Sequence, residues 1–524
     1  MPPISVTELK REIMSSDLRI KISHWVYRVA AASVLASVLY YLAVVVYIIL
    51  CHIRYPFSLE FVEGDSLIQV YRILQGKLLY AQPSYQYVAM DYPPIYFYIS
   101  ALFARLIGFG FFPLRLVSFV SSLGCISVIY LICRKEGTRI LPALIASGFF
   151  AGTYKLGGVW FDIARVDMLA LFLVLLAVYL TRFKSLAAYI MAGIVFAFSC
   201  LTKQTNLFIL AFLCLYFMLF ERNKTLGFVL SSIGSFIIIS LWLNRVYSGW
   251  YSFYVYKITF GSGSNLPITP SMVLNSVGDF WLKALLIPIP IAVVLAGGYF
   301  VIMFIRSKKE IDKPFIFYFF FTAGMIGASW GALIHPGGAN NVLLPGYAAI
   351  AMLLGLTIQN LFLEQNVNLL PKSGLLVVCT IQFVMLYFPI QPLIPTQADL
   401  LAGRSMVAEV QRQPGDVYVH FHPEISLMAG KPTFADWVSL YQLEGDFGGG
   451  DARETNRVKS EFTHAMATQE FSMIILDKDI NWVWGHPEKY YYQSDEPVFN
   501  NPNVFWPVIG FQIRPTIIMY PEQK

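Results

Sequence analysis

Two carboxylates, Glu63 and Asp65, flank a glycine in the stretch FVEGDSLIQV, directly after a long apolar run. A carboxylate at a membrane surface is partly shielded from bulk water, and this shielding raises its pKa toward the range of a useful general base. Either residue could therefore take a proton from an acceptor hydroxyl or amine. Asp65 also precedes a helical pattern and could instead cap that helix, so both interpretations stay open.

Two further polar pairs lie at the ends of apolar runs. Arg165 and Asp167 begin one run, where the arginine could hold a phosphate through paired hydrogen bonds. The alternative is an interfacial anchor in which the two charges neutralise each other. Lys203 and Gln204 lie in the LTKQTN turn between two short runs. They could make a second phosphate or sugar contact, or the lysine could simply snorkel to the surface.

A glycine-containing connection, HPGGANN at 335–341, is a weaker candidate. Glycines let backbone N–H groups approach an anion closely. The side chains of His335, Asn340 and Asn341 could hydrogen-bond sugar hydroxyls, and the segment is equally typical of a plain connecting loop.

The elements that must position these residues follow from composition. The chain has 524 residues, of which 57% are hydrophobic and only 13% charged, whereas about 25% of residues are charged in soluble domains. Many windows reach the roughly 18–20 apolar residues that cross a bilayer. The sequence therefore predicts a polytopic α-helical membrane protein. The net charge of +6 does not indicate nucleic acid, because the basic residues lie in short connections between apolar runs.

Metal and disulfide chemistry are not expected. The 6 cysteines lie in or beside apolar segments, so they form neither a disulfide framework nor a zinc spacing. No cluster of His, Cys and carboxylates has metal-ligand spacing, and we expect no cofactor. The polar, basic start of the chain also lacks the pattern of a cleavable signal peptide.

Basic residues give the topology, because cytoplasmic loops carry excess Lys and Arg. We predict about 11 spans, with segment 1–28 cytoplasmic, a transmembrane domain at 29–391 and an extracytoplasmic domain at 392–524. The expected spans are 29–50, 114–133, 140–158, 167–181, 186–202, 205–220, 226–245, 282–304, 315–333, 344–362 and 373–391. The basic loops that fix this frame contain Arg134/Lys135/Arg139, Arg182/Lys184, Arg222/Lys224, Arg306 to Lys313, and Lys372.

The segments that face outward have their own patterns. The long first outer loop, 51–113, contains an amphipathic helix in DSLIQVYRILQGKLLY and a second short helix near 95–109. In the tail, GDVYVHF and FSMIILD predict short strands, DARETNRVKSEFTHAMATQE predicts a helix between them, and GDFGGGD predicts a loop. The tail is therefore expected to be a small α/β domain. The polar candidates all converge on this side, whereas a transporter places some near the bilayer midplane.

The order of short motifs carries a resemblance. The chain resembles the GT-C superfamily of integral membrane glycosyltransferases over about residues 29–391. It is most similar to the bacterial family-39-like branch, which is related to protein O-mannosyltransferases and the lipid A aminoarabinose transferase. The motifs are, in order, the acidic start of the first loop, Asp91-Tyr92-Pro93-Pro94, Arg115–Ser118, Arg165 with Asp167, and Thr202–Thr205.

The resemblance implies a polyprenyl-phosphate-linked sugar donor, an outward-opening cavity and an acidic base in the first outer loop. It also implies that Asp91, Tyr92 and Asp167 bind or position substrate. Members often carry adjacent Asp-Glu where this chain has Glu63-Gly64-Asp65. Glu63 is the preferred base because Asp65 has capping as a competing role.

The expected reaction is inverting transfer of a hexose or pentose to a glycan, lipid or protein acceptor outside a bacterial plasma membrane. The alternatives are a transporter or flippase of lipid-linked sugars, or an assembly protein whose tail binds a partner.

Overall fold

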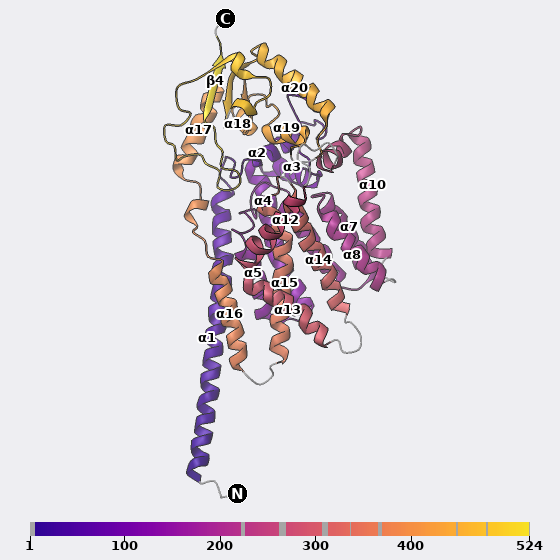
Figure 1. Ribbon diagram of the computed structural model, residues 1–524, viewed down its shortest axis with the longest axis vertical. Coiled ribbons are helices and arrows are strands. Elements are labelled where there is room, and N and C mark those ends of the chain that lie inside the picture. Colours follow the sequence, from indigo (N-terminus) through magenta and orange to yellow (C-terminus); the bar gives the residue numbers. More distant parts are fainter. Residues whose placement is uncertain are drawn as a thin grey trace.

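The chain forms a bundle of apolar helices with a small mixed domain on one end (Figure 1). The structure, a computed structural model, describes residues 6–221, 226–260, 269–306, 313–335, 337–364, 369–446, 449–477 and 480–522. The N-terminus and the C-terminus lie at opposite ends of the molecule in Figure 1.

Each of the predicted spans contains an apolar helix. These helices are α1 (Val6–His52), α4 (Phe111–Lys135), α5 (Ile140–Gly152), α6 (Asp167–Thr181), α7 (Leu186–Cys200), α8 (Asn206–Phe220), α10 (Ser231–Val246), α13 (Pro290–Arg306), α14 (Lys313–Ile334), α15 (Leu344–Glu364) and α16 (Leu369–Met385). Five spans within the described ranges are long and apolar enough to cross a membrane alone. The polytopic α-helical fold is therefore confirmed. The basic residues Arg222 and Lys224, and those within 307–312, lie outside the described ranges.

One pair of helices is sharply bent. Helix α12 (Pro270–Val277) continues into η3 (Gly278–Leu286), and this unit meets α13 at an angle of 97°. Pro288 and Pro290 stand at the bend. Because proline lacks an N–H group and clashes with the preceding turn, it ends or kinks a helix. Other short elements near the bundle are η1 (Leu226–Leu230), α11 (Trp250–Ser252), η2 (Phe253–Ile258), η4 (Asn340–Leu343) and η5 (Gln391–Leu393).

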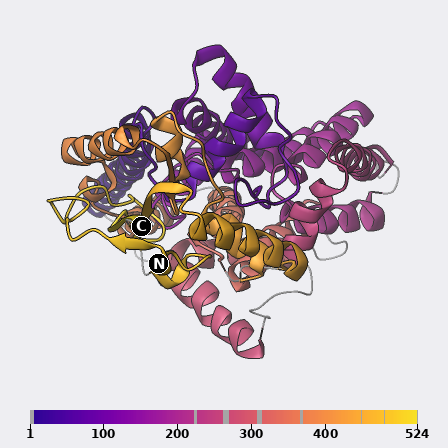
Figure 2. The same ribbon diagram turned by 90° about the horizontal axis from the view of Figure 1, so that it is seen from above.

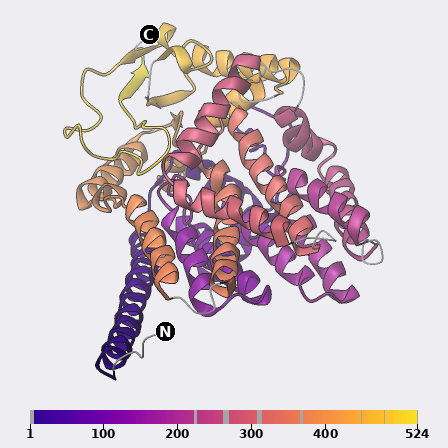
Figure 3. The ribbon, with the colours of Figure 1, turned by 60° about the horizontal axis from the view of Figure 1, so that its bottom comes forward.

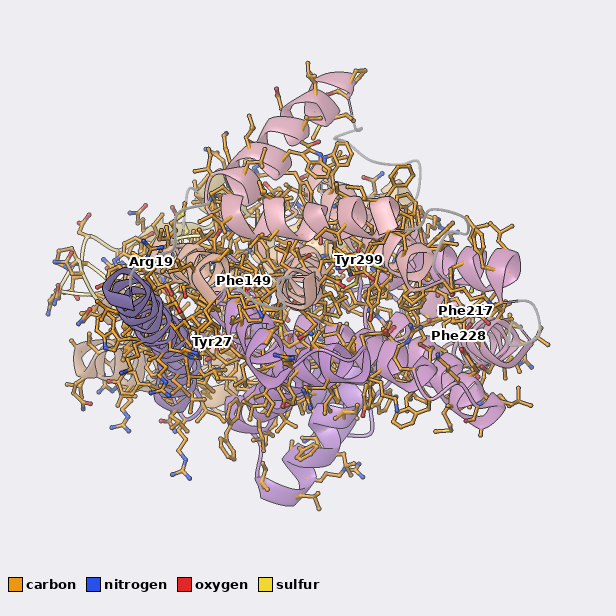
Figure 4. The ribbon with its side chains drawn as sticks, turned by 90° about the horizontal axis from the view of Figure 1, so that it is seen from below. Arg19, Tyr27, Phe149, Phe217, Phe228 and Tyr299 are labelled. Carbon is orange, nitrogen blue, oxygen red and sulfur yellow. The ribbon has the colours of Figure 1, made fainter. Side chains whose placement is uncertain are left out.

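Helix α15 forms the centre of the bundle and packs against α5, α13 and α14. Gly355 of α15 allows the close approach to α5, because an added Cβ would lie 2.9 Å from the Cβ of Ala146. Small residues at such contacts are typical of membrane helices. At the edge of the bundle far from α1, Phe217 of α8 and Phe228 of η1 pack with ring centroids 4.7 Å apart (Figure 4). The long α1 lies along the edge of the bundle, beside α16 (Figure 3).

The segment between α1 and α4 contains both predicted helices, α2 (Glu63–Leu74) and α3 (Ile95–Ile107). The first two turns of α2 are buried from Glu63 to Val70. Helix α3 exposes Leu102 and Leu106, with 58% and 72% of each side chain accessible. Exposed leucines on an amphipathic helix fit a position in the membrane interface.

The C-terminal domain covers the end of the bundle that carries α2 and α3, as Figure 2 shows from above. Its sheet has the order β1-β2-β4-β3, with β1 parallel to β2 and the other pairs antiparallel. Both predicted strands and the helix between them are present, as β1, β2 and α20. Part of the expected GDFGGGD loop, residues 447–448, lies outside the described ranges. The elements are α17 (Gln397–Arg412), β1 (Asp416–Val419), α18 (Pro423–Met428), α19 (Trp437–Glu444), α20 (Ala452–Ala467), β2 (Phe471–Leu476), η6 (Ile480–Trp482), η7 (Pro487–Lys489), β3 (Tyr491–Gln493) and β4 (Ile517–Pro521).

Candidate active site

The first carboxylate of the FVEGDSLIQV stretch is fully engaged. Glu63 is completely buried and accepts hydrogen bonds from Arg115 Nε at 3.0 Å and Nη2 at 2.7 Å. It also accepts the backbone N–H groups of Leu59 at 2.6 Å and Ala164 at 2.5 Å. Each oxygen therefore has two donors, and Glu63 ties the start of α2 to α4 and to the segment before α6.

Arg115 is equally saturated. Besides Glu63, it donates to the carbonyl oxygens of His52 at 3.0 Å, Tyr55 at 2.6 Å and Phe57 at 2.7 Å. A guanidinium has five N–H donors in a fixed planar fork, and all of them are used here. The sequence shows Arg115 only as part of a family motif, and its role as the partner of Glu63 comes from the fold.

Asp65 has the opposite environment. Only 1% of its side chain is exposed, yet neither carboxylate oxygen has a hydrogen-bond partner among the described residues. Helix α2 begins at Glu63, and its N-cap is Val62, without a side-chain cap. Asp65 therefore lies in the first turn and does not cap the helix. Burial raises its pKa well above the usual range, and the charges of Asp436 and Glu424 add to the effect.

Arg165 is the cation on the membrane-domain side of Asp65. Its Nη2 donates to the Tyr92 hydroxyl at 3.1 Å, and its Nη1 lies 3.6 Å from Glu60 Oε2. Nε and Nη1 donate no hydrogen bond within the part of the chain that the structure describes, although only 7% of the residue is exposed. Burial raises the pKa of Glu60 to about 7, against the opposing charge of Arg165. Sequence reasoning missed Glu60, whose position in FSLEFVEGD offers no distinguishing signal.

A second cluster lies where α6, α8 and η4 meet. Lys203 Nζ donates to Asp167 Oδ1 at 2.6 Å, and Asn341 Nδ2 donates to the same oxygen at 2.8 Å. The other oxygen, Asp167 Oδ2, has no partner in the described ranges. A small cavity opens beside this cluster. Its lining combines these polar groups with Ala170, Leu171, Ala328, Ala332, Val342 and Leu344.

The remaining predicted residues lie around these two groups. Gln204 Nε2 donates to the Asp91 carbonyl at 3.0 Å, and Gln442 Nε2 of the C-terminal domain donates to Asp91 Oδ1 at 3.1 Å. His335 lies near enough to act electrostatically on Asp91. Asn340 is exposed and is not brought into either cluster.

Two acidic residues of the C-terminal domain were also not predicted. Asp436 accepts hydrogen bonds from Ser439 N at 3.0 Å and Oγ at 2.9 Å, and therefore caps α19. Glu424 stands at the start of α18 and accepts the Ser58 hydroxyl at 2.5 Å. Both are more than 350 residues from Asp65 in the chain, so only the fold shows their proximity. Among the described residues, no group of three or more metal-ligating side chains is arranged to hold a metal.

Comparisons with known proteins agree with this architecture. Residues 91–244, from the loop before α3 to α10, match the family described as dolichyl-phosphate-mannose-protein mannosyltransferase. The crystal structure of ArnT from Cupriavidus metallidurans bound to undecaprenyl phosphate is similar over 92% of this chain and 97% of that chain, with a TM-score of 0.55 and 13% identity. Its apo state gives the same TM-score with 12% identity.

An archaeal structure is also similar. The apo oligosaccharyltransferase of Archaeoglobus fulgidus matches over 86% of this chain and 73% of that chain, with a TM-score of 0.50 and 11% identity. No curated protein sequence matches the chain. The fold is therefore shared with these two proteins, and the match at 91–244 to a mannosyltransferase family supports the resemblance predicted from the motif order.

Proposed function

We propose that this protein is a membrane glycosyltransferase that moves a sugar from a polyprenyl-phosphate-linked donor to an acceptor hydroxyl or amine. The GT-C fold and the family match at 91–244 support the reaction class. The undecaprenyl phosphate named with the ArnT structure supports the class of donor. In this proposal the N-terminus is cytoplasmic, and the C-terminal domain and both polar clusters lie on the outer side of the plasma membrane.

The observation that carries the proposal is that Asp65 and Arg165 are both buried and both have polar atoms without a hydrogen-bond partner among the described residues. The carboxylate has no hydrogen-bond donor, and the buried guanidinium has two nitrogens that donate no hydrogen bond within the described ranges. The two groups are close enough to affect each other electrostatically. Burying unsatisfied polar groups costs free energy, so such an arrangement is typical of a site whose partner is a substrate.

Asp65 is the proposed base. A base needs a lone pair directed at the proton it removes, and all four acceptor positions of Glu63 are already occupied. Asp65 has free oxygens and a raised pKa, which favours proton acceptance once the group is ionised. Glu63 then holds the helix that carries Asp65.

Arg165 and Lys203 are the proposed phosphate ligands. A guanidinium with free N–H groups can bind a phosphate through two hydrogen bonds. Lys203 lies beside a small cavity whose lining includes the apolar residues Ala170, Leu171 and Leu344. Asp167 holds the Lys203 ammonium in place, and Asn341 donates to the same carboxylate oxygen. Asp91, Tyr92 and Gln204 are further proposed donor-binding residues.

The proposed reaction is a single displacement. Asp65 takes the proton of the acceptor, the acceptor oxygen or nitrogen forms a bond to the sugar C1, and the bond from C1 to the phosphate oxygen breaks. The electron pair leaves with the polyprenyl phosphate, and the sugar configuration inverts. The cations Arg165 and Lys203 stabilise the charge that develops on the phosphate.

The experiment compares Asp65→Asn with wild type as purified full chains, with Asp495→Asn as control because Asp495 is an exposed carboxylate of the C-terminal domain. Mass spectrometry of copurified lipids should show a polyprenyl-phosphate sugar retained on Asp65→Asn and discharged by wild type after addition of a membrane glycan and lipid extract. Discharge by Asp65→Asn at the wild-type rate would exclude the base assignment. Copurification of bulk phospholipid alone by every variant would contradict the donor class.

A further inference from the structure

The C-terminal domain places two carboxylates directly over the start of α2. Helix α18 packs against α2, and its second residue, Glu424, lies on the backbone of Gly64. Asp436, the N-cap of α19, faces Asp65 closely enough for a side-chain hydrogen bond. All three acidic side chains are at most 6% exposed. The α2 carboxylate therefore shares a buried space with two acids from a separate domain.

Gly64 makes this approach possible. A Cβ added at Gly64 would overlap the Glu424 carboxylate, and it would lie 2.7 Å from Glu424 Cδ. The Glu424 carboxylate occupies the space that a side chain at position 64 would take. The glycine between Glu63 and Asp65 thus leaves space for a carboxylate that arrives from the C-terminal domain.

The three carboxylates Asp65, Glu424 and Asp436 form an interdomain carboxyl cluster, and its members differ in their hydrogen-bond partners. Glu424 Oε1 accepts the Ser58 hydroxyl and lies 3.5 Å from His422 Nδ1, whose Nε2 lies 2.7 Å from Asp477 Oδ2. Glu424 Oε2 has no hydrogen-bond partner within the described ranges, and Asp65 has none there besides a proton shared with Asp436. The partnered groups hold the two C-terminal acids in position beside Asp65.

We propose that the C-terminal domain completes the catalytic centre, with Asp436 and Glu424 as positioning residues that act through Asp65. This inference rests on the proposed function, in which Asp65 is the base. Asp436 and Glu424 do not contact the reacting atoms. They make Asp65 a stronger base than an isolated aspartate and fix its orientation.

The electrostatics support this role. Burial contributes most to the raised pKa of Asp65, and the nearby charges of Asp436 and Glu424 raise it further, against the opposing charge of Arg165. Burial also raises the pKa of Asp436, against the two hydrogen bonds from Ser439. Two carboxyl groups in contact cannot both ionise easily, and they share a proton until the pH is high enough to remove it. The protonated Asp65 donates to Asp436. When the shared proton leaves to solvent as the pH rises, the ionised Asp65 that remains is the base.

Removing either neighbouring carboxylate should lower the pKa of Asp65. Asp436→Asn removes a negative charge beside Asp65, so the ionised form of Asp65 becomes less unfavourable and its pKa falls. Glu424→Gln removes the other charge and acts in the same direction. A merely structural role would lower the amount of folded protein without moving the titration of Asp65.

The test measures the infrared band of protonated carboxyl groups in the full chain labelled with ¹³C-aspartate, as a function of pH. The band lost in Asp65→Asn identifies Asp65. Its midpoint should fall by on the order of one pH unit in Asp436→Asn, by less in Glu424→Gln, and not at all in Asp495→Asn. Should Asp436→Asn fail to fold, the shift in Glu424→Gln decides, because glutamine keeps the acceptor for Ser58. An unchanged Asp65 midpoint in the folded variants overturns the proposal.

Sugar transfer measured over the same pH range separates the two proposals. The acid limb of the rate should move to lower pH in Asp436→Asn by the amount that the infrared midpoint moves. An infrared shift without any detectable transfer contradicts the proposed function and leaves the interdomain carboxyl cluster supported. Transfer with an unmoved acid limb supports the function and contradicts the cluster.

Discussion

Arg115 and Glu63 form a fully buried pair, joined by hydrogen bonds of 3.0 Å and 2.7 Å. Arg115 reaches from α4 to the first turn of α2, and its other donors hold three carbonyl groups of the segment after α1. The pair therefore fixes the position of Asp65, two residues along the same helix, without taking part in the chemistry.

The Arg115–Glu63 pair predicts that Glu63→Gln destabilises the folded protein and does not act on the transfer step. Removing one partner of a buried ion pair costs about 3–5 kcal/mol, because the other charge is left uncompensated. We expect a lower thermal midpoint for Glu63→Gln in detergent, together with near-normal transfer per folded molecule at low temperature. Asp65→Asn should behave in the opposite way, with normal stability and no transfer. Loss of transfer in fully folded Glu63→Gln would return the base role to Glu63.

The position of Lys203 predicts that its positive charge contributes to the affinity for the lipid-phosphate donor. Its ammonium is held by Asp167 at 2.6 Å beside the cavity, so Lys203→Met should weaken binding of polyprenyl phosphate on the order of tenfold or more. Lys203→Arg keeps the charge and should retain most of the affinity. Native mass spectrometry with added undecaprenyl phosphate measures both variants. Equal affinity of Lys203→Met and wild type would remove Lys203 from the phosphate site.

The sequence could predict much of the framework, because membrane helices and their connections are local features. Apolar runs of sufficient length predicted the spans, and short segments rich in aromatic and β-branched residues predicted β1 and β2. The convergence of Arg165, Asp167, Lys203 and Asn341 followed from their common position at the ends of spans. The hydrogen bonds of Lys203 and Asn341 to Asp167 bring three of these residues together.

The roles of the two first-loop carboxylates could not be read in the same way. Glu63 and Asp65 have the same chemistry and differ by two positions, so only their partners distinguish them. Arg115, Glu424 and Asp436 are distant in sequence, and each reaches α2 through tertiary packing. Contacts between a loop and a separate domain leave no periodic pattern of residues in the sequence, so sequence reasoning could not find them.

His422 predicts that stability declines on the alkaline side. The charge of Asp477 and the nearby Glu424 raise its pKa to about 10, although burial acts in the opposite direction. A histidine whose pKa is higher in the folded state stabilises the fold fully below the pKa of the unfolded state, about 6.5. This stabilisation is lost as the pH rises through the pKa of the folded state. Thermal midpoints of wild type should therefore fall from about pH 7 to pH 10 beyond the fall seen in His422→Gln. Parallel curves for the two proteins would exclude this linkage.

Gly64 predicts a destabilising glycine-to-alanine substitution inside a helix. Alanine normally stabilises a helix by roughly 0.5–1 kcal/mol relative to glycine. At Gly64 the added Cβ would overlap the Glu424 carboxylate, so this buried carboxylate must leave its position against α2. We expect Gly64→Ala to lower the thermal midpoint, to speed hydrogen exchange in α18, and to reduce transfer.

Gly234 of α10 supplies the matched control, because an added Cβ there meets nothing within 4 Å. Gly234→Ala should therefore be neutral or slightly stabilising, and it should leave exchange in α18 unchanged. The difference between the two variants isolates the contact with Glu424 from helix propensity. If Gly64→Ala matched Gly234→Ala in both stability and exchange, the close packing of the C-terminal domain on α2 would be refuted, and with it the delivery of Glu424 and Asp436 to Asp65.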